Sequence, residues 1–101
     1  MDSPEKSGQF RQIPRVPDHI TTRFLSGEAF IMNLKNLKTY SLNETAADIW
    51  SCIDGSRSIE EIFKKILSDY DISDTQCRSD VRETIEQFHT EELVIFDDPH
   101  E

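Results

Sequence analysis

Apolar and polar side chains in the first half of the chain follow a pattern typical of β-strands. Two β-prone runs, 20–25 and 28–33, are separated by a Ser-Gly pair at 26–27, which favours a tight hairpin turn. A second turn, in which Asn36 can take the left-handed conformation, leads into a third run at 38–42. The pattern therefore predicts a three-stranded antiparallel sheet.

After residue 42 the apolar residues recur with the 3.6-residue period of a helix. Asn43 is a suitable N-cap for the first helix. We expect this helix to end at Gly55, because glycine readily takes the left-handed conformation that stops a helix. Its apolar positions are Ala46, Ala47, Ile49, Trp50 and Ile53.

Two further helices are each predicted to begin at a capping box, in which the N-cap side chain and the side chain three residues later bind each other's backbone. Ser58 pairs with Glu61 in the first box, and Ser73 pairs with Gln76 in the second. The outer face of the first of these helices also places two glutamates four residues before lysines, Glu60 with Lys64 and Glu61 with Lys65.

A sheet followed by a run of helices indicates an α+β fold, and three helices beside a small sheet describe a winged helix-turn-helix. We expect one domain over residues 18–96, closed by an apolar run at 93–96. Residues 1–17 hold three of the four prolines and are expected to form a flexible arm, and residues 97–101 a solvated tail. A length of 101 residues is typical of one domain, so we expect no second, cofactor-binding domain.

Charge is unevenly distributed along the chain. The formal net charge is -9, of which residues 1–43 contribute +2 and residues 44–101 contribute -11. Nucleic acids and anionic membranes bind clustered cations, so neither is an expected partner. The sequence has no apolar run near the roughly 20 residues of a membrane span and no secretory signal at its N-terminus, so we expect a cytoplasmic location.

The sequence lacks the common catalytic and nucleotide-binding motifs, so we expect no catalytic residue, no cofactor and no metal site. The three histidines lack the helical spacing of a zinc site. Cys52 and Cys77 are expected to be small buried apolar residues in a reducing compartment. A thiol-based redox enzyme is the weaker alternative.

The third predicted strand, 38–42, is an edge that offers unpaired N–H and C=O groups to an extended peptide. If this strand lies beside the last helix, a groove forms between its hydrogen-bonding edge and the helix's apolar stripe, which is flanked by Arg78 and Arg82. Such a flank could attract an anionic peptide. The alternative is that both arginines form intrahelical ion pairs, for instance Arg78 with Asp74 and Arg82 with Glu86.

A distinctive sequence begins in the third strand, with Tyr-Ser-Leu-Asn-Glu-Thr-Ala-Ala-Asp-Ile-Trp at 40–50, Ile-Asp-Gly at 53–55 and Ser-Ile-Glu-Glu-Ile at 58–62. This order of Leu-Asn, small residues, Ile-Trp, Asp-Gly and a Ser-capped helix resembles the signature of the PqqD-like family. The junction at 70–73 and the Asp-Val step at 80–81 are also similar. The resemblance covers roughly residues 19–96.

The resemblance implies a function. PqqD-like proteins are small winged-helix recognition elements for ribosomally synthesised and post-translationally modified peptides (RiPPs), and they act as non-catalytic peptide chaperones. They bind the leader of a precursor peptide as an added strand, between the third strand and the third helix, and present it to a modifying enzyme such as a radical S-adenosylmethionine (SAM) protein. By position, the implied groove here has Lys38, Thr39, Tyr40, Ser41 and Leu42 opposite Arg78, Val81, Arg82 and Ile85.

The chain departs from the family pattern at Asn36 and Glu92, where the family commonly has glycine. The resemblance therefore fits either pyrroloquinoline quinone (PQQ) synthesis or another RiPP pathway. The alternative from a different class is a winged-helix transcriptional regulator that reads DNA with its third helix, although that helix is predominantly acidic. The precursor, the enzyme and the oligomeric state, including a homodimer, stay open.

Overall fold

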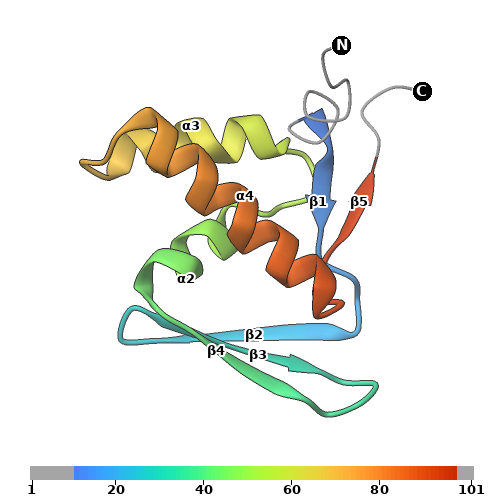
Figure 1. Ribbon diagram of the computed structural model, residues 1–101. Coiled ribbons are helices and arrows are strands. Elements are labelled where there is room, and N and C mark those ends of the chain that lie inside the picture. The colour runs from blue at the N-terminus through green and yellow to red at the C-terminus, as the bar shows by residue number, and fades with distance from the viewer. Residues whose placement is uncertain (1–10, 98–101) are drawn as a thin grey trace.

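The computed structural model in Figure 1 describes residues 11–97. A three-stranded antiparallel sheet in the order β2-β3-β4 precedes three helices, which confirms the predicted α+β fold. A short second sheet pairs the two ends of the described chain, and its strands are β1 and β5. The elements are β1 (Ile13–Arg15), β2 (Ile20–Leu25), β3 (Glu28–Asn33), β4 (Thr39–Leu42), α2 (Glu44–Ser51), α3 (Ile59–Asp69), α4 (Asp74–Thr90) and β5 (Ile95–Asp97).

Each helix begins at the cap that the sequence predicts. The Asn43 side chain accepts a hydrogen bond from the Ala46 N–H at the start of α2. Both bonds of the Ser58 capping box are present at the start of α3. The box predicted for α4 is half formed: the Ser73 hydroxyl accepts from the Gln76 N–H, but the Gln76 side chain donates to Asp80 instead of returning to Ser73.

The predicted end of α2 is wrong by four residues. The helix ends at Ser51, and Cys52 forms its C-cap. Gly55 does have a left-handed conformation, with φ of 83°, but it lies in the loop beyond the helix. In this loop the Asp54 carboxylate accepts hydrogen bonds from the backbone N–H groups of Ser56 and Arg57, and these bonds lower the pKa of Asp54.

The two turns of the sheet differ in how well the sequence predicts them. The hairpin at 26–27 is confirmed, because Ser26 and Gly27 both have positive φ, 51° and 82°. In the second turn the left-handed residue is Leu37, with φ of 64°, and not Asn36 as predicted. The Asn36 side chain instead accepts a hydrogen bond from the Lys38 N–H, so it stabilises the turn without adopting that conformation.

The prediction of a flexible arm over residues 1–17 is wrong for residues 13–15. These residues form β1, which pairs antiparallel with β5 and brings Pro14 opposite Phe96. Pro14 is fully buried. The Gln12 carbonyl also accepts a hydrogen bond from the Ile59 N–H at the start of α3. The predicted tail begins one residue too early, since residue 97 belongs to β5; residues 1–10 and 98–101 lie outside the described chain.

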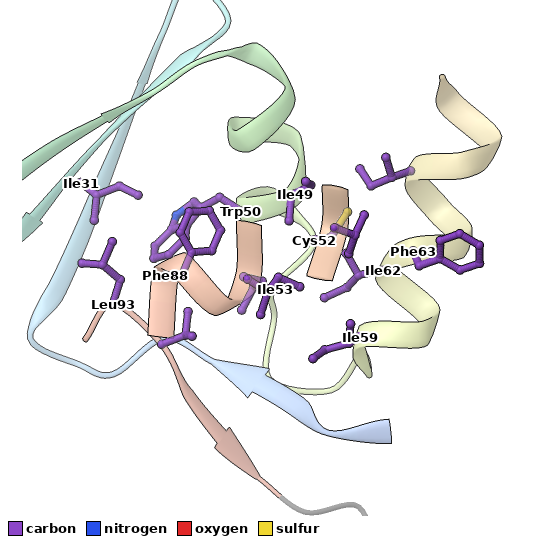
Figure 2. Packing of buried hydrophobic residues seen from close by; sticks show 14 of the residues in the cluster. Ile31, Ile49, Trp50, Cys52, Ile53, Ile59, Ile62, Phe63, Phe88 and Leu93 are labelled. Atoms are coloured by element: carbon purple, nitrogen blue, oxygen red, sulfur yellow. The ribbon is translucent and has the colours of Figure 1, made fainter. Parts of the chain in front are cut away.

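The core lies between the inner face of the three-stranded sheet and the helices (Figure 2). Trp50 of α2 packs edge-on against Phe88 of α4, with ring centroids 5.1 Å apart, and donates its indole N–H to the Thr22 hydroxyl of β2. Cys52 and Cys77 are buried free thiols, which confirms their expected role as small apolar residues. No helix within residues 11–97 is both long and apolar enough to cross a bilayer.

Candidate functional site

The outer edge of β4 is open. Within residues 11–97, β4 pairs with β3 alone, and no described strand lies on its other side. An open edge of this kind is a template on which another chain can pair. Of the five residues predicted for this wall of the groove, four form β4, and Lys38 lies just before it, in the turn.

Along an edge strand, every second residue directs its backbone N–H and C=O toward the neighbouring strand, and the residues between direct theirs outward. One hydrogen bond is enough to show which residues of β4 belong to each set. The Asn33 N–H donates to the Lys38 carbonyl over 2.9 Å, so alternate residues of β4 direct their backbone groups toward β3. Tyr40 and Leu42 lie two and four residues after Lys38, so their backbone groups also point toward β3. The N–H and C=O groups of Thr39 and Ser41 therefore point away from the sheet.

The side chains of β4 alternate in the same way between the two faces of the sheet. Tyr40 and Leu42 are half-buried and pack against the core, whereas Thr39 and Ser41 are exposed on the outer face. The open edge thus has two hydrogen-bonding residues, Thr39 and Ser41, and two half-buried residues that face the helices.

The C-terminal end of α4 lies beside Tyr40. Burial raises the pKa of the Tyr40 hydroxyl, and the nearby carboxylates of Glu91 and Glu92 raise it further. Neither glutamate was identified from the sequence as part of the site. A helical-wheel count could have pointed to Glu91, because it lies on the side of α4 opposite to Arg82.

Val81 and Ile85 do not form an open wall of the groove. Both are fully buried, at 0% exposure, and belong to the core cluster that α4 shares with the sheet and the other helices. They are in place to support the site from beneath. Contact with a bound chain is available to the half-buried residues Tyr40 and Leu42.

Arg78 lies on a different side of α4 from Tyr40. Its guanidinium stacks over the Phe63 ring of α3 at 4.1 Å and forms ion pairs with Glu60 at 3.2 Å and Asp74 at 3.4 Å. The Asp74 pair is the intrahelical alternative that the sequence had left open. Arg78 therefore joins α4 to α3 and does not contribute a cationic wall beside β4.

Arg82 is four residues after Arg78, so it lies on the same side of α4. His89 also lies on this side and stacks on Phe96 of β5, with ring centroids 4.6 Å apart. Two members of the basic flank of α4 therefore contact other elements, Arg78 on α3 and His89 on β5. The flank beside Tyr40 carries carboxylates, which reverses the charge expected for the groove.

No group of three or more His, Cys, Asp or Glu side chains within residues 11–97 could hold a metal ion. Burial raises the pKa of the Cys52 thiol and of the Cys77 thiol, which keeps both protonated and unreactive at neutral pH. A redox role for these cysteines has no support in this geometry.

The α4 helix is also unsuited to reading DNA. One of its two arginines, Arg78, is already paired with carboxylates, and the acidic side chains Asp74, Asp80, Glu83, Glu86 and Glu91 lie on or next to the helix. A recognition helix needs a net cationic surface to approach phosphates. The DNA-binding alternative is therefore not supported.

Solved structures share this fold. The complex of TbiB1 with the TbiA(beta) leader peptide matches with a TM-score of 0.74 and 20% identity, over 79% of this chain and 93% of that one. Lasso peptide synthetase B1 complexed with the leader peptide matches with a TM-score of 0.73 and 16% identity, over 81% and 96%.

A third match is the PqqD truncation of Methylobacterium extorquens PqqCD, described as a functional and stand-alone RiPP recognition element. Its TM-score is 0.67 at 16% identity, over 82% of this chain and 88% of that one. No curated protein sequence matches the chain. The family model for coenzyme PQQ synthesis protein D (PqqD) matches residues 28–94, which span the sheet from β3 and all three helices. The chain belongs to the PqqD family.

Proposed function

We propose that this chain is a non-catalytic RiPP recognition element that binds the leader of a precursor peptide as a fourth strand on β4. The observation that carries the proposal is the open edge of β4, where the backbone groups of Thr39 and Ser41 point away from the sheet. Membership of the PqqD family supports it, as do the two structural matches determined with leader peptides.

Strand addition gives the two parts of the site different roles. Backbone hydrogen bonds to Thr39 and Ser41 supply affinity without regard to the guest's side chains. Side chains of the guest alternate between the two faces of the sheet. One set lies near Tyr40, Leu42 and the end of α4, where specificity arises, and the other set lies near Thr39 and Ser41 on the outer face.

The charge beside Tyr40 favours a different guest from the one expected at first. Glu91 and Glu92 lie close enough to raise the pKa of Tyr40, while Arg78 is paired on the α3 side. A leader with a lysine or arginine near this end of β4 is therefore preferred over an acidic one. We place Arg78 and Arg82 outside the peptide contact and Val81 and Ile85 beneath it.

The bound precursor is presented to a modifying enzyme. A radical SAM enzyme is the partner that the family resemblance favours, in PQQ synthesis or another RiPP pathway. Because the precursor is made on ribosomes, this step takes place in the cytoplasm. In this proposal the chain itself supplies binding and orientation, and the modifying enzyme supplies the chemistry.

A proline substitution tests strand addition directly. Ser41→Pro removes one outward N–H from β4 while leaving the bonds between β4 and β3 in place. The matched control is Phe24→Pro in β2, whose N–H points outward on the opposite edge by the same alternation, because the Leu34 N–H donates to the His19 carbonyl. The probe is a synthetic leader peptide of a candidate RiPP precursor.

Calorimetric titration should show binding of the leader to the wild-type chain and to Phe24→Pro with similar affinity. Ser41→Pro should weaken binding by roughly tenfold, the loss expected for about 1.4 kcal/mol. Equal affinity of both variants would contradict strand addition on β4, and selective loss in Phe24→Pro would move the site to β2.

A further inference from the structure

The outer face of the three-stranded sheet points away from the helices (Figure 1). It carries exposed apolar side chains, whereas the solvated face of a sheet is normally polar. β3 directs Phe30 and Met32 to this face, where they are 38% and 37% exposed. Leu25 at the end of β2 is also exposed. Adjoining exposed apolar side chains on a small protein mark an interaction surface.

A hollow of about 300 Å³ lies on this face. Its lining includes Arg23, Phe30 and Met32. The strand register pairs Arg23 with Phe30 and sets Met32 between Thr21 and Thr39. An apolar side chain inserted here would contact Phe30 and Met32 while a neighbouring carboxylate reached Arg23.

Charge indicates what kind of surface would cover this face. No ion pair of Arg23 is found within residues 11–97, so its charge is available to a partner. The half of the chain that contains the sheet has a net charge of +2, and the half that contains the helices has -11. An acidic protein is therefore attracted to the sheet and repelled by the helices.

The outer face is continuous with the open edge of β4, because Thr39 belongs to both. A guest strand on β4 would widen the sheet, and every second side chain of the guest would extend the outer face next to Thr39 and Ser41. A protein seated on the outer face would therefore contact the guest peptide as well as this chain.

We propose that the outer face, defined by Arg23, Phe30 and Met32, is the docking surface for the modifying enzyme. The enzyme's contact surface is an apolar protrusion flanked by carboxylates. This inference rests on the proposed function, because it takes the guest on β4 to be the peptide that the enzyme must reach. It leaves the helices free of the enzyme.

The test measures enzyme binding and leader binding separately, with a candidate RiPP-modifying enzyme and the leader peptide of its precursor as probes. Arg23→Glu and Phe30→Thr alter the outer face. The matched controls are Lys64→Glu, an exposed charge reversal on α3, and Ile95→Thr, an exposed apolar residue of β5. All four side chains are exposed, so the thermal unfolding midpoints should stay close to that of the wild type.

The two outer-face variants should lose roughly tenfold or more in affinity for the enzyme, and the loss for Arg23→Glu should shrink at high salt. Both controls should bind the enzyme like the wild type, and all four variants should bind the leader normally. Unchanged enzyme affinity of Arg23→Glu and Phe30→Thr would overturn the inference.

Two other results would also overturn it. Loss of leader binding in the outer-face variants would assign this face to the peptide. Self-association of the chain that Phe30→Thr abolishes would show that a second copy covers it. By contrast, failure of the leader to bind the wild-type chain would overturn the proposed function alone. Loss of enzyme binding in Arg23→Glu and Phe30→Thr, with normal enzyme binding in the two controls, would still support the docking surface.

Discussion

Glu92 follows α4 in the left-handed conformation, with φ of 66°. Its N–H donates to the His89 carbonyl, and the next N–H, of Leu93, donates to the Phe88 carbonyl. These two bonds form a Schellman motif, in which glycine usually occupies the position of Glu92. The glutamate therefore holds a strained conformation so that the chain can turn from α4 toward β5.

Glu92→Gly should stabilise the chain by about 1 kcal/mol, because relief of the left-handed strain exceeds the entropy that glycine adds to the unfolded state. Chemical denaturation provides the measurement. Glu91→Gly is the control: Glu91 has φ of -84°, so glycine there brings no relief and should lower stability. A destabilised Glu92→Gly would contradict this account of the turn.

The sequence predicts the role of a residue well where that role depends only on a few neighbours along the chain. The caps Asn43 and Ser58 bond to backbone groups three residues away, so the sequence reveals them. Contacts set by packing were not predictable in this way. Glu60, expected to pair with Lys64, pairs across to Arg78 of α4 over 3.2 Å, and that contact exists only once the two helices are packed together.

At the scale of elements, the orientation of α4 decides which of its sides faces β4. The sequence showed an apolar stripe with a basic flank and an acidic flank, but it could not show which flank lies toward the sheet. The structure places Arg78 against α3 and Glu91 beside Tyr40. The predicted edge strand is present, whereas Arg78 of the predicted cationic wall packs against α3.

The contact between α4 and β4 can be measured through the pKa of Tyr40, which burial and Glu91 raise above its ordinary value. Glu91→Gln should lower this pKa, measured by phenolate absorbance in a Tyr70→Phe background that leaves one tyrosine. Glu83→Gln, which changes an exposed glutamate elsewhere on α4, should leave it unchanged. An unaltered Tyr40 titration in Glu91→Gln would show that this end of α4 does not lie beside β4.

The raised pKa of Tyr40 also makes the stability of the fold depend on pH in the alkaline range. Because the pKa of Tyr40 is raised in the folded state, the neutral hydroxyl contributes stability below the unfolded-state pKa of about 10. That contribution is lost as the pH rises through the higher folded-state pKa. Glu91→Gln should therefore make the loss of stability at alkaline pH smaller.

The β1–β5 sheet shows a different limit of prediction. Its strands are three residues each, and the Arg15–Asp97 ion pair joins positions 82 residues apart. Short strands with a proline lack the alternation that reveals longer ones. The pairing becomes visible only when the two ends of the domain are brought together by the rest of the fold.

Removing β1 should destabilise the domain. A chain that begins at residue 18 loses the buried Pro14, the partly buried Val16 and the Gln12 bond to α3, so its free energy of unfolding should fall by about 2 kcal/mol. A chain that begins at residue 11, which keeps β1, is the control and should be the more stable of the two by this amount. Equal stability of the two shortened chains would mean that the second sheet contributes nothing to the fold.

At the scale of the whole molecule, the sheet and the helices differ in charge and therefore in the partners they attract. The sheet offers an open edge and belongs to the half of the chain with a net charge of +2, and the helices form an acidic body that repels nucleic acid and anionic surfaces. The fold class and the edge strand β4 could be predicted because strands and helices each have a characteristic spacing of apolar residues, which the sequence shows directly. The outer face could not, because its pattern of Arg23, Phe30 and Met32 exists only in the register of two strands.

Amide hydrogen exchange, resolved by residue with and without the leader peptide, is the most direct measurement of strand addition on β4. The exchange of the Thr39 and Ser41 amides should slow by roughly tenfold or more when the leader binds, because their outward N–H groups gain partners. The outward amides of Thr22 and Phe24 on β2 should not change. Binding of the leader with no protection of Thr39 and Ser41, or with protection of Thr22 and Phe24 instead, would contradict the account.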